Sequence, residues 1–80
     1  MRLDKYLKVS RIIKRRTVAN EACDQGRVAV NGNPAKASYD VKVGDVLELR
    51  FGEKTMKVRV LRVSEHVGKG EAAELYEVMP

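Results

Sequence analysis

Basic side chains are concentrated in the first 17 residues of this chain. The segment Arg2–Thr17 holds seven of the 16 basic residues and a single acid, Asp4, so its formal charge is +6, whereas the whole chain carries +5. Lysine and arginine at this density are typical of a surface that binds phosphates and displaces their counterions. The alternative is a solvated helix face, but such faces usually alternate acidic with basic residues. The seven residues are Arg2, Lys5, Lys8, Arg11, Lys14, Arg15 and Arg16.

A helix starting near Arg2 would position these side chains. At about 100° per residue, five residues fall on one face and predict a core-facing stripe, whereas Lys5, Lys8 and Arg11 point away from it, with Asp4 beside them. Ile12 falls on the basic side, so we expect the regular helix to end or tighten between 10 and 13, with 14–16 in a turn. The stripe consists of Leu3, Tyr6, Leu7, Ser10 and Ile13.

A second helix is predicted over Thr17–Gln25, with Gly26 as its C-terminal stop. Its apolar face would contain Val18, Ala19, Ala22 and Cys23, so Cys23 is interpreted as a small core residue rather than a reactive thiol. Two short helices joined by a tight basic turn are typical of a helix-turn-helix.

The remainder of the chain has the alternation of short strands. We predict strands over 27–31 and 46–51 and a third that runs to Val60 after a hairpin loop at 52–54, with Asn31-Gly32 as a hairpin turn and a short edge strand at Pro34. The apolar parity shifts after Val60, which indicates a bulge or a strand end. The segment 71–79 fits a short helical turn, a final strand, or both. The expected inward residues are Leu47, Leu49, Phe51, Met56, Val58 and Val60. The fold class predicted is α+β, with two N-terminal helices packed on a small, mostly antiparallel sheet.

Several function classes are disfavoured by composition. Eighty residues predict one domain, and no stretch resembles a signal peptide or a membrane span, so we expect a cytoplasmic protein without membrane contact. One cysteine and one histidine argue against a disulfide and a metal site. No catalytic constellation is recognisable, and Gly68-Lys69-Gly70 lacks the spacing of a phosphate-binding loop, so we expect neither an enzyme nor a cofactor.

Four ordered motifs resemble the αL RNA-binding domain first described in small-subunit ribosomal protein four. They are Arg2-Leu3-Asp4-Lys5-x-Leu7, Arg15-Arg16-Thr17-x-Ala19, Gly26-Arg27-Val28-x-Val30-Asn31-Gly32 and Val43-Gly44-Asp45. The resemblance covers 1–51, and 52–80 is expected to be a strand extension that completes the same domain. Such a domain is often an appendage of a catalytic unit, as in pseudouridine synthases and tyrosyl-tRNA synthetases, whereas this sequence contains essentially the domain itself.

Some proteins consist of this domain alone. Among them, two segments of this sequence are similar to the heat-shock-protein-fifteen family, and specifically to its members that act in ribosome-associated quality control. They are the Lys8-to-Thr17 run and Gly32-Asn33-x-Ala35-Lys36-x-Ser38. This resemblance implies binding to ribosomal RNA of the large subunit that still carries a peptidyl-tRNA, and we expect the protein to be a monomer. The resemblance also implies assistance to the partner RqcH in alanine tailing of the stalled chain.

The resemblance places the RNA-facing surface mainly on the basic segment. Arg2 and Arg16 are the strongest candidates, because a guanidinium can bridge two phosphate oxygens or stack on a base. Asp4 has two interpretations: a first-turn carboxylate favoured by the helix dipole, or a group that orients an arginine or accepts a bond from RNA. Lys36 is equally well a phosphate contact or a solvated lysine. The full candidate set is Arg2, Asp4, Lys5, Lys8, Arg11, Lys14, Arg15, Arg16, Thr17 and Lys36.

Two alternatives remain at this level. A structural or assembly protein of the ribosome would use the same surface. A DNA-binding helix-turn-helix protein is disfavoured, because Asn20, Glu21 and Asp24 in its second helix would repel phosphates at the groove.

Overall fold

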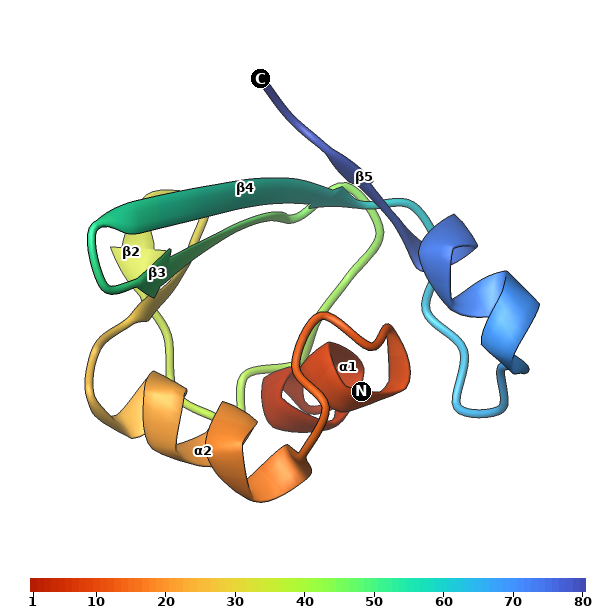
Figure 1. Cartoon of the computed structure of the whole chain (residues 1–80), viewed down its shortest axis with the longest axis horizontal. Helices are drawn as coiled ribbons and strands as arrows, with labels where there is room; N and C mark the ends of the chain where they lie inside the picture. Colours follow the sequence, from red (N-terminus) through yellow and green to blue (C-terminus); the bar gives the residue numbers. More distant parts are fainter.

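The computed structural model describes residues 1–80, except for the side chain of Lys69. Helices α1 (Leu3–Val9) and α2 (Arg16–Asp24) pack together beneath an antiparallel sheet (Figure 1). The strands are β1 (Val28–Val30), β2 (Asn33–Pro34), β3 (Val46–Phe51), β4 (Lys54–Val60) and β5 (Tyr76–Val78), in the order β2-β1-β3-β4-β5. The predicted α+β class, with two N-terminal helices packed on a small antiparallel sheet, is confirmed.

The sheet is built from the alternation seen in the sequence. Leu47 pairs with Val30 on one side and Val58 on the other, and Leu49 pairs with Val28 and Met56. The β1–β2 hairpin turns at Asn31 (φ 51°) and Gly32 (φ 88°), as the Asn-Gly dipeptide predicts, and β2 with its proline lies at the sheet edge. The inward side chains form one core with the helices.

The helices follow the predicted pattern with small shifts of boundary. All five residues of the expected α1 stripe are buried, between 0% and 6% exposed. The helix ends at Val9, where the Ser10 hydroxyl donates to the Leu7 carbonyl at 3.2 Å and Arg11 adopts a φ of 63°. Helix α2 begins at Arg16, so Arg16 lies in its first turn rather than in the connecting turn. Gly26 (φ 73°) follows it as predicted.

Three placements predicted from the sequence are wrong. Asp4 is buried rather than on the solvated face, because α2 covers it. Val18 is 46% exposed, because α2 packs inward through Ala19 and Cys23, and residue 18 lies about 100° around the helix from 19. Phe51 is 43% exposed, because it lies at the end of β3, paired with Lys54 at the hairpin. On its other side β3 pairs with β1 only as far as Leu49.

Cys23 is buried, as expected for a core residue. Burial raises the pKa of its thiol to about 11, and the charges of Asp4 and Asp24 act in the same direction. The thiol is therefore protonated at neutral pH and a poor nucleophile.

The C-terminal segment contains both elements that the sequence allowed. A 3-10 helix, η1 (Lys69–Leu75), precedes β5, which pairs with β4. The hydroxyl of Tyr6 in α1 donates to the Leu75 carbonyl at 2.7 Å, and both side chains are fully buried. Burial also raises the pKa of Tyr6, so this hydroxyl stays protonated and can donate. Strand β4 ends at Val60, where the apolar parity shifts.

We expect Tyr6→Phe to lower the free energy of unfolding by about 1 kcal/mol, because it removes one buried hydrogen bond. The loss stays small because the Leu75 carbonyl keeps the backbone N–H of Leu61 at 2.8 Å. Urea denaturation of both proteins measures the difference. A loss several times larger would mean that the hydroxyl supports more than this link.

Candidate nucleic-acid interface

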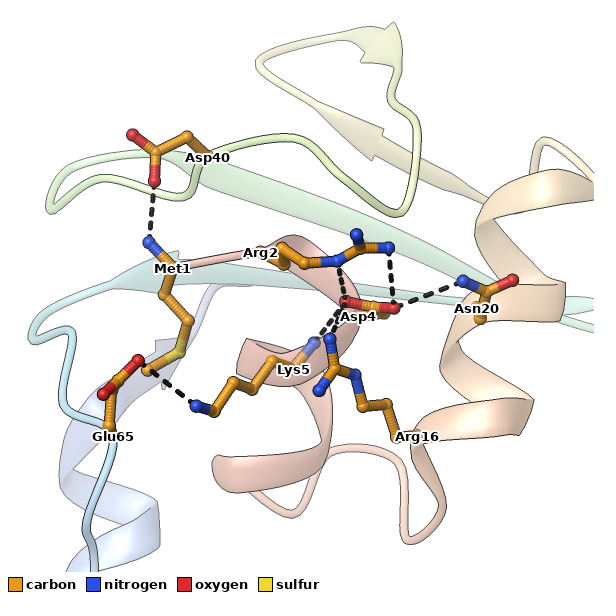
Figure 2. Close-up of polar contacts among 8 residues, drawn as sticks. All are labelled: Met1, Arg2, Asp4, Lys5, Arg16, Asn20, Asp40 and Glu65. Atoms are coloured by element: carbon orange, nitrogen blue, oxygen red, sulfur yellow. Dashed lines mark hydrogen bonds and ion pairs between the residues drawn. The ribbon is translucent and has the colours of Figure 1, made fainter.

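Asp4 is the centre of a polar cluster that joins the two helices. Its Oδ1 accepts hydrogen bonds from the Arg2 Nε at 3.2 Å and the Lys5 backbone N–H at 2.8 Å, and the Arg16 Nη2 approaches it at 3.5 Å. Its Oδ2 accepts from the Arg2 Nη2 at 3.4 Å and from the Asn20 Nδ2 at 3.2 Å. Figure 2 shows the carboxylate between the arginines and the asparagine. One acidic group thus fixes four residues from α1, α2 and their boundaries.

The two arginines differ from Asp4 in their exposure. The Asp4 side chain is 3% exposed, whereas those of Arg2 and Arg16 are 50% and 47% exposed. A guanidinium has five N–H donors, and only part of each set is used on the carboxylate. Each arginine is therefore held in place on one side and presents donors to solvent on the other, which is the arrangement that a phosphate or a base can use.

Asp4 is ionised in the folded protein. Burial raises its pKa, but the hydrogen bonds from Arg2, Asn20 and the Lys5 N–H, together with the charge of Arg16, outweigh burial, so the pKa lies below its ordinary value. The carboxylate is therefore charged at neutral pH and attracts both arginines. The structure agrees with both of its interpretations, because Asp4 lies in the first turn of α1, where it accepts a backbone N–H, and it also orients two arginines.

Lys36 comes close to this cluster through backbone pairing. The N–H groups of Leu3 and Asp4 donate to the carbonyls of Tyr39 and Ala37, at 2.8 Å and 3.2 Å, so the segment after β2 runs along the start of α1. Arg2 and Lys36 consequently line one shallow hollow together with Asn20. Thr17 lines a neighbouring hollow with Asp4 and Arg16.

A second group of candidate residues lies at the other end of α1. Lys8, Arg11 and Lys14 line a groove together with Glu65 of the segment after β4. Lys5 donates to the Glu65 Oε1 at 3.2 Å, on the side of α1 away from Asn20 (Figure 2). Arg15 is exposed, in extended backbone, just before α2. Nine of the ten candidates thus fall into two groups along α1 and the start of α2, and Arg15 belongs to neither.

Two residues of this surface were not singled out by the sequence. Asn20 is expected from the sequence only as a polar residue of the second helix that disfavours DNA binding, yet its side chain donates to Asp4. Its position four residues after Arg16 on one helix face could have signalled this. Glu65 lies 60 residues from Lys5 in the chain, and no local pattern predicts such a pair.

The later family motifs form a separate structural cluster. Asp45 accepts hydrogen bonds from the Asn31 Nδ2 at 3.1 Å, the Tyr39 hydroxyl at 2.9 Å and the Lys42 N–H at 2.9 Å. Burial raises the pKa of Asp45, but these bonds outweigh burial and the pKa is lowered. This carboxylate fixes the Asn-Gly turn against the loop before β3.

Among the described residues, no group of three histidine, cysteine or acidic side chains is placed to hold a metal ion. Within the same residues, the longest helices fall short of the length and apolarity that a membrane crossing needs.

We expect Asp4→Asn to lower the free energy of unfolding by about 1–3 kcal/mol at neutral pH, because it removes a buried charge that is bonded to two arginines. A lowered folded-state pKa stabilises the fold above the unfolded pKa, and this stabilisation is lost as the pH falls through the folded value. The difference between wild type and variant should therefore narrow below about pH 4.

Urea denaturation across that pH range measures this difference. Asp24→Asn, an exposed change on α2, is the control. A gap between wild type and Asp4→Asn that does not depend on pH would contradict the role assigned to the charge.

Comparison with known proteins gives this surface a context. The S4 domain family model matches residues 1–47. The RQC P-site tRNA stabilizing factor of Halalkalibacterium halodurans is 62% identical over 78 residues, which cover 98% of this chain and 89% of that protein. The protein of the same name from Bacillus subtilis is 57% identical over 79 residues, covering 99% and 92%.

A solved structure agrees with these relatives. Vibrio cholerae Heat Shock Protein 15, described as a trimer, superposes with a TM-score of 0.90 at 34% identity, over 99% of this chain and 81% of that one. The heat-shock-protein-fifteen resemblance is thereby confirmed. The chain therefore belongs to the S4 domain family and, within it, to the group of RQC P-site tRNA stabilizing factors.

Proposed function

We propose that this chain is a non-catalytic RNA-binding factor of ribosome-associated quality control. It would bind the large ribosomal subunit that is obstructed by a peptidyl-tRNA, in the cytoplasm and as a monomer. The observation that carries the proposal is the Arg2–Asp4–Arg16 cluster, in which a buried carboxylate holds two half-exposed guanidinium groups. The name of its relatives, RQC P-site tRNA stabilizing factor, supports the same function.

The cluster suits folded RNA for a physical reason. A flexible arginine loses side-chain entropy when it binds a phosphate, whereas one already fixed by a neighbour loses less. The bonds to Asp4 already order the side chains of Arg2 and Arg16 when the protein folds, so both are pre-organised for binding. The remaining cations of the surface, from Lys5 to Arg15 together with Lys36, would add phosphate contacts around them.

Stabilising a tRNA on the ribosome requires differential affinity. A protein shifts the populations of two tRNA positions only if it binds one position more tightly than the other. A rigid basic surface fits this role, because its phosphate contacts are satisfied by one arrangement of ribosomal RNA and tRNA and by few others. We propose that the chain favours the P-site tRNA in this way while RqcH extends the stalled chain with alanine.

A structural or assembly protein of the ribosome is the second candidate, because it would use the same basic surface. It should be present on ribosomes in stoichiometric amounts and without stalling. The shared name of the relatives favours the quality-control function.

We expect Arg16→Ala to weaken binding to large subunits that carry peptidyl-tRNA about tenfold, because it removes a charged donor from the pre-organised pair. Co-sedimentation over a salt series measures this. About six phosphate contacts give the wild type a log–log slope of roughly −4 to −5, and the variant should lose about one unit of slope.

Arg59→Ala is the matched control. Its side chain is also 47% exposed and also paired with one carboxylate, Glu77, but it lies on the β4–β5 pair of the sheet. Equal weakening by both substitutions would refute a specific role for the cluster. Wild-type protein that spreads over all RNA, or that ignores ribosomes, would refute the proposed function.

We expect alanine tailing in a reconstituted system of obstructed large subunits and RqcH to be faster with this protein than without it, because the tRNA is held in the productive position. The readout is the length of the tail against time. Arg16→Ala should give an intermediate rate that rises as its concentration is raised, since the variant is impaired in binding. Equal rates with and without the wild-type protein would refute the tailing role.

A further inference from the structure

The groove at the C-terminal end of α1 contains an acid where a simple phosphate-binding surface would have none. It has a volume of about 520 Å³ and is lined by Lys8, Val9, Arg11, Lys14, Glu65 and Val67. We propose that this groove binds one unpaired nucleotide of RNA and that Glu65 selects guanine as its base. The inference rests on the proposed RNA-binding function and identifies a feature of the RNA that is recognised.

The three cations provide a site for the nucleotide's phosphate. Lys8 belongs to α1, whereas Arg11 and Lys14 belong to the turn that follows it, so the charges converge on the groove from two elements. Arg11 is also held at a φ of 63°, a conformation that disfavours a residue with a Cβ and suits glycine. A strained arginine at a charged groove suggests that its side chain serves binding rather than folding.

The apolar wall of the groove suits a base. Val9 and Val67 are partly buried and pack against the hydrophobic core, so each exposes part of a fixed apolar surface to the groove. Unpaired bases of RNA bind in this manner, against apolar, aromatic or guanidinium surfaces, with their edges free for hydrogen bonds. The volume lies within the range of about 300–1,000 Å³ that is usual for small-molecule sites.

Glu65 is placed to read the edge of that base. Its side chain is 62% exposed, and its Oε1 accepts a hydrogen bond from Lys5 at 3.2 Å. This hydrogen bond and the charge of Lys5 lower the pKa of Glu65, so the carboxylate is ionised and can only accept. Each carboxylate oxygen can accept more than one hydrogen bond. The bond from Lys5 therefore fixes the Glu65 side chain and leaves both oxygens able to accept further hydrogen bonds.

An ionised carboxylate discriminates among the four bases. Guanine presents two adjacent donors, N1–H and the 2-amino group, to its two oxygens. Adenine and cytosine present one amino group beside an acceptor nitrogen, which the carboxylate repels, and uracil presents one donor between two acceptors. Guanine is therefore the only one of the four bases that can donate two hydrogen bonds to the Glu65 carboxylate.

The test uses the full-length protein and four fluorescein-labelled RNA pentamers, UUGUU, UUAUU, UUCUU and UUUUU, with fluorescence anisotropy at constant salt. We expect wild type to bind UUGUU about tenfold more tightly than the other three, as a bidentate base contact gives. Glu65→Ala should remove this preference. Glu77→Ala should retain it, because Glu77 is a similarly exposed carboxylate, paired with Arg59 at 3.2 Å, on the sheet.

A second variant separates binding from folding. Arg11→Gly relieves the positive φ, so we expect it to fold at least as stably as wild type while binding all four pentamers more weakly. If Arg11→Gly binds the pentamers as tightly as wild type, Arg11 does not contact the phosphate, and the proposed phosphate site would be overturned.

Two results would overturn the inference. The first is equal binding of the four pentamers by wild type. The second is a Glu65→Ala variant that binds every pentamer more tightly by the same factor, which would make Glu65 a competitor of RNA for Lys5 instead of a reader of bases. Either result, with co-sedimentation on large subunits intact, leaves the proposed function in place. If the protein does not co-sediment with large subunits but still prefers guanine, the proposed function would be refuted, whereas the inference about the groove would stand.

Discussion

A buried carboxylate must be compensated by partners, and in this chain the partners of Asp4 come from both helices. This requirement couples folding to the candidate interface. The bonds that neutralise the acid are the same bonds that fix Arg2 and Arg16 at the surface, half exposed. Because Asp4 is buried, salt screens its attraction for the two arginines less than it screens a surface ion pair. The positions of the arginine side chains are therefore well fixed.

The sheet and the C-terminal segment serve this arrangement from the other side. Val28, Leu47 and Val58 are buried in the same hydrophobic core as the inward residues of α1, and the Tyr6 hydroxyl ties α1 to Leu75. The same C-terminal segment carries Glu65 back to Lys5, so it also forms one wall of the groove at the end of α1. A short helix that would be marginal in isolation is thus held from three directions.

Much of the fold could be predicted from the sequence, because the periods of its apolar residues are clear. The α1 stripe, the Asn31-Gly32 turn and the alternation of β3 and β4 each follow from local patterns, and the structure agrees with them except at Phe51. The errors arose where tertiary coverage decides exposure. Phe51 has the parity of a core residue but lies exposed at the β3–β4 hairpin, and Val18 has an apolar neighbour in the chain but lies on the exposed side of α2.

The sequence by itself determined the class of partner, because seven cations with one acid within a short segment leave a charge that no local pairing can neutralise. It also determined which residues are candidates. Only the tertiary structure decided how they are grouped. Asn20 and Arg16 meet Asp4 because two helices pack, and Glu65 meets Lys5 because a strand returns the chain to α1. Contacts of this kind join residues that are far apart in the chain, and no local period encodes them.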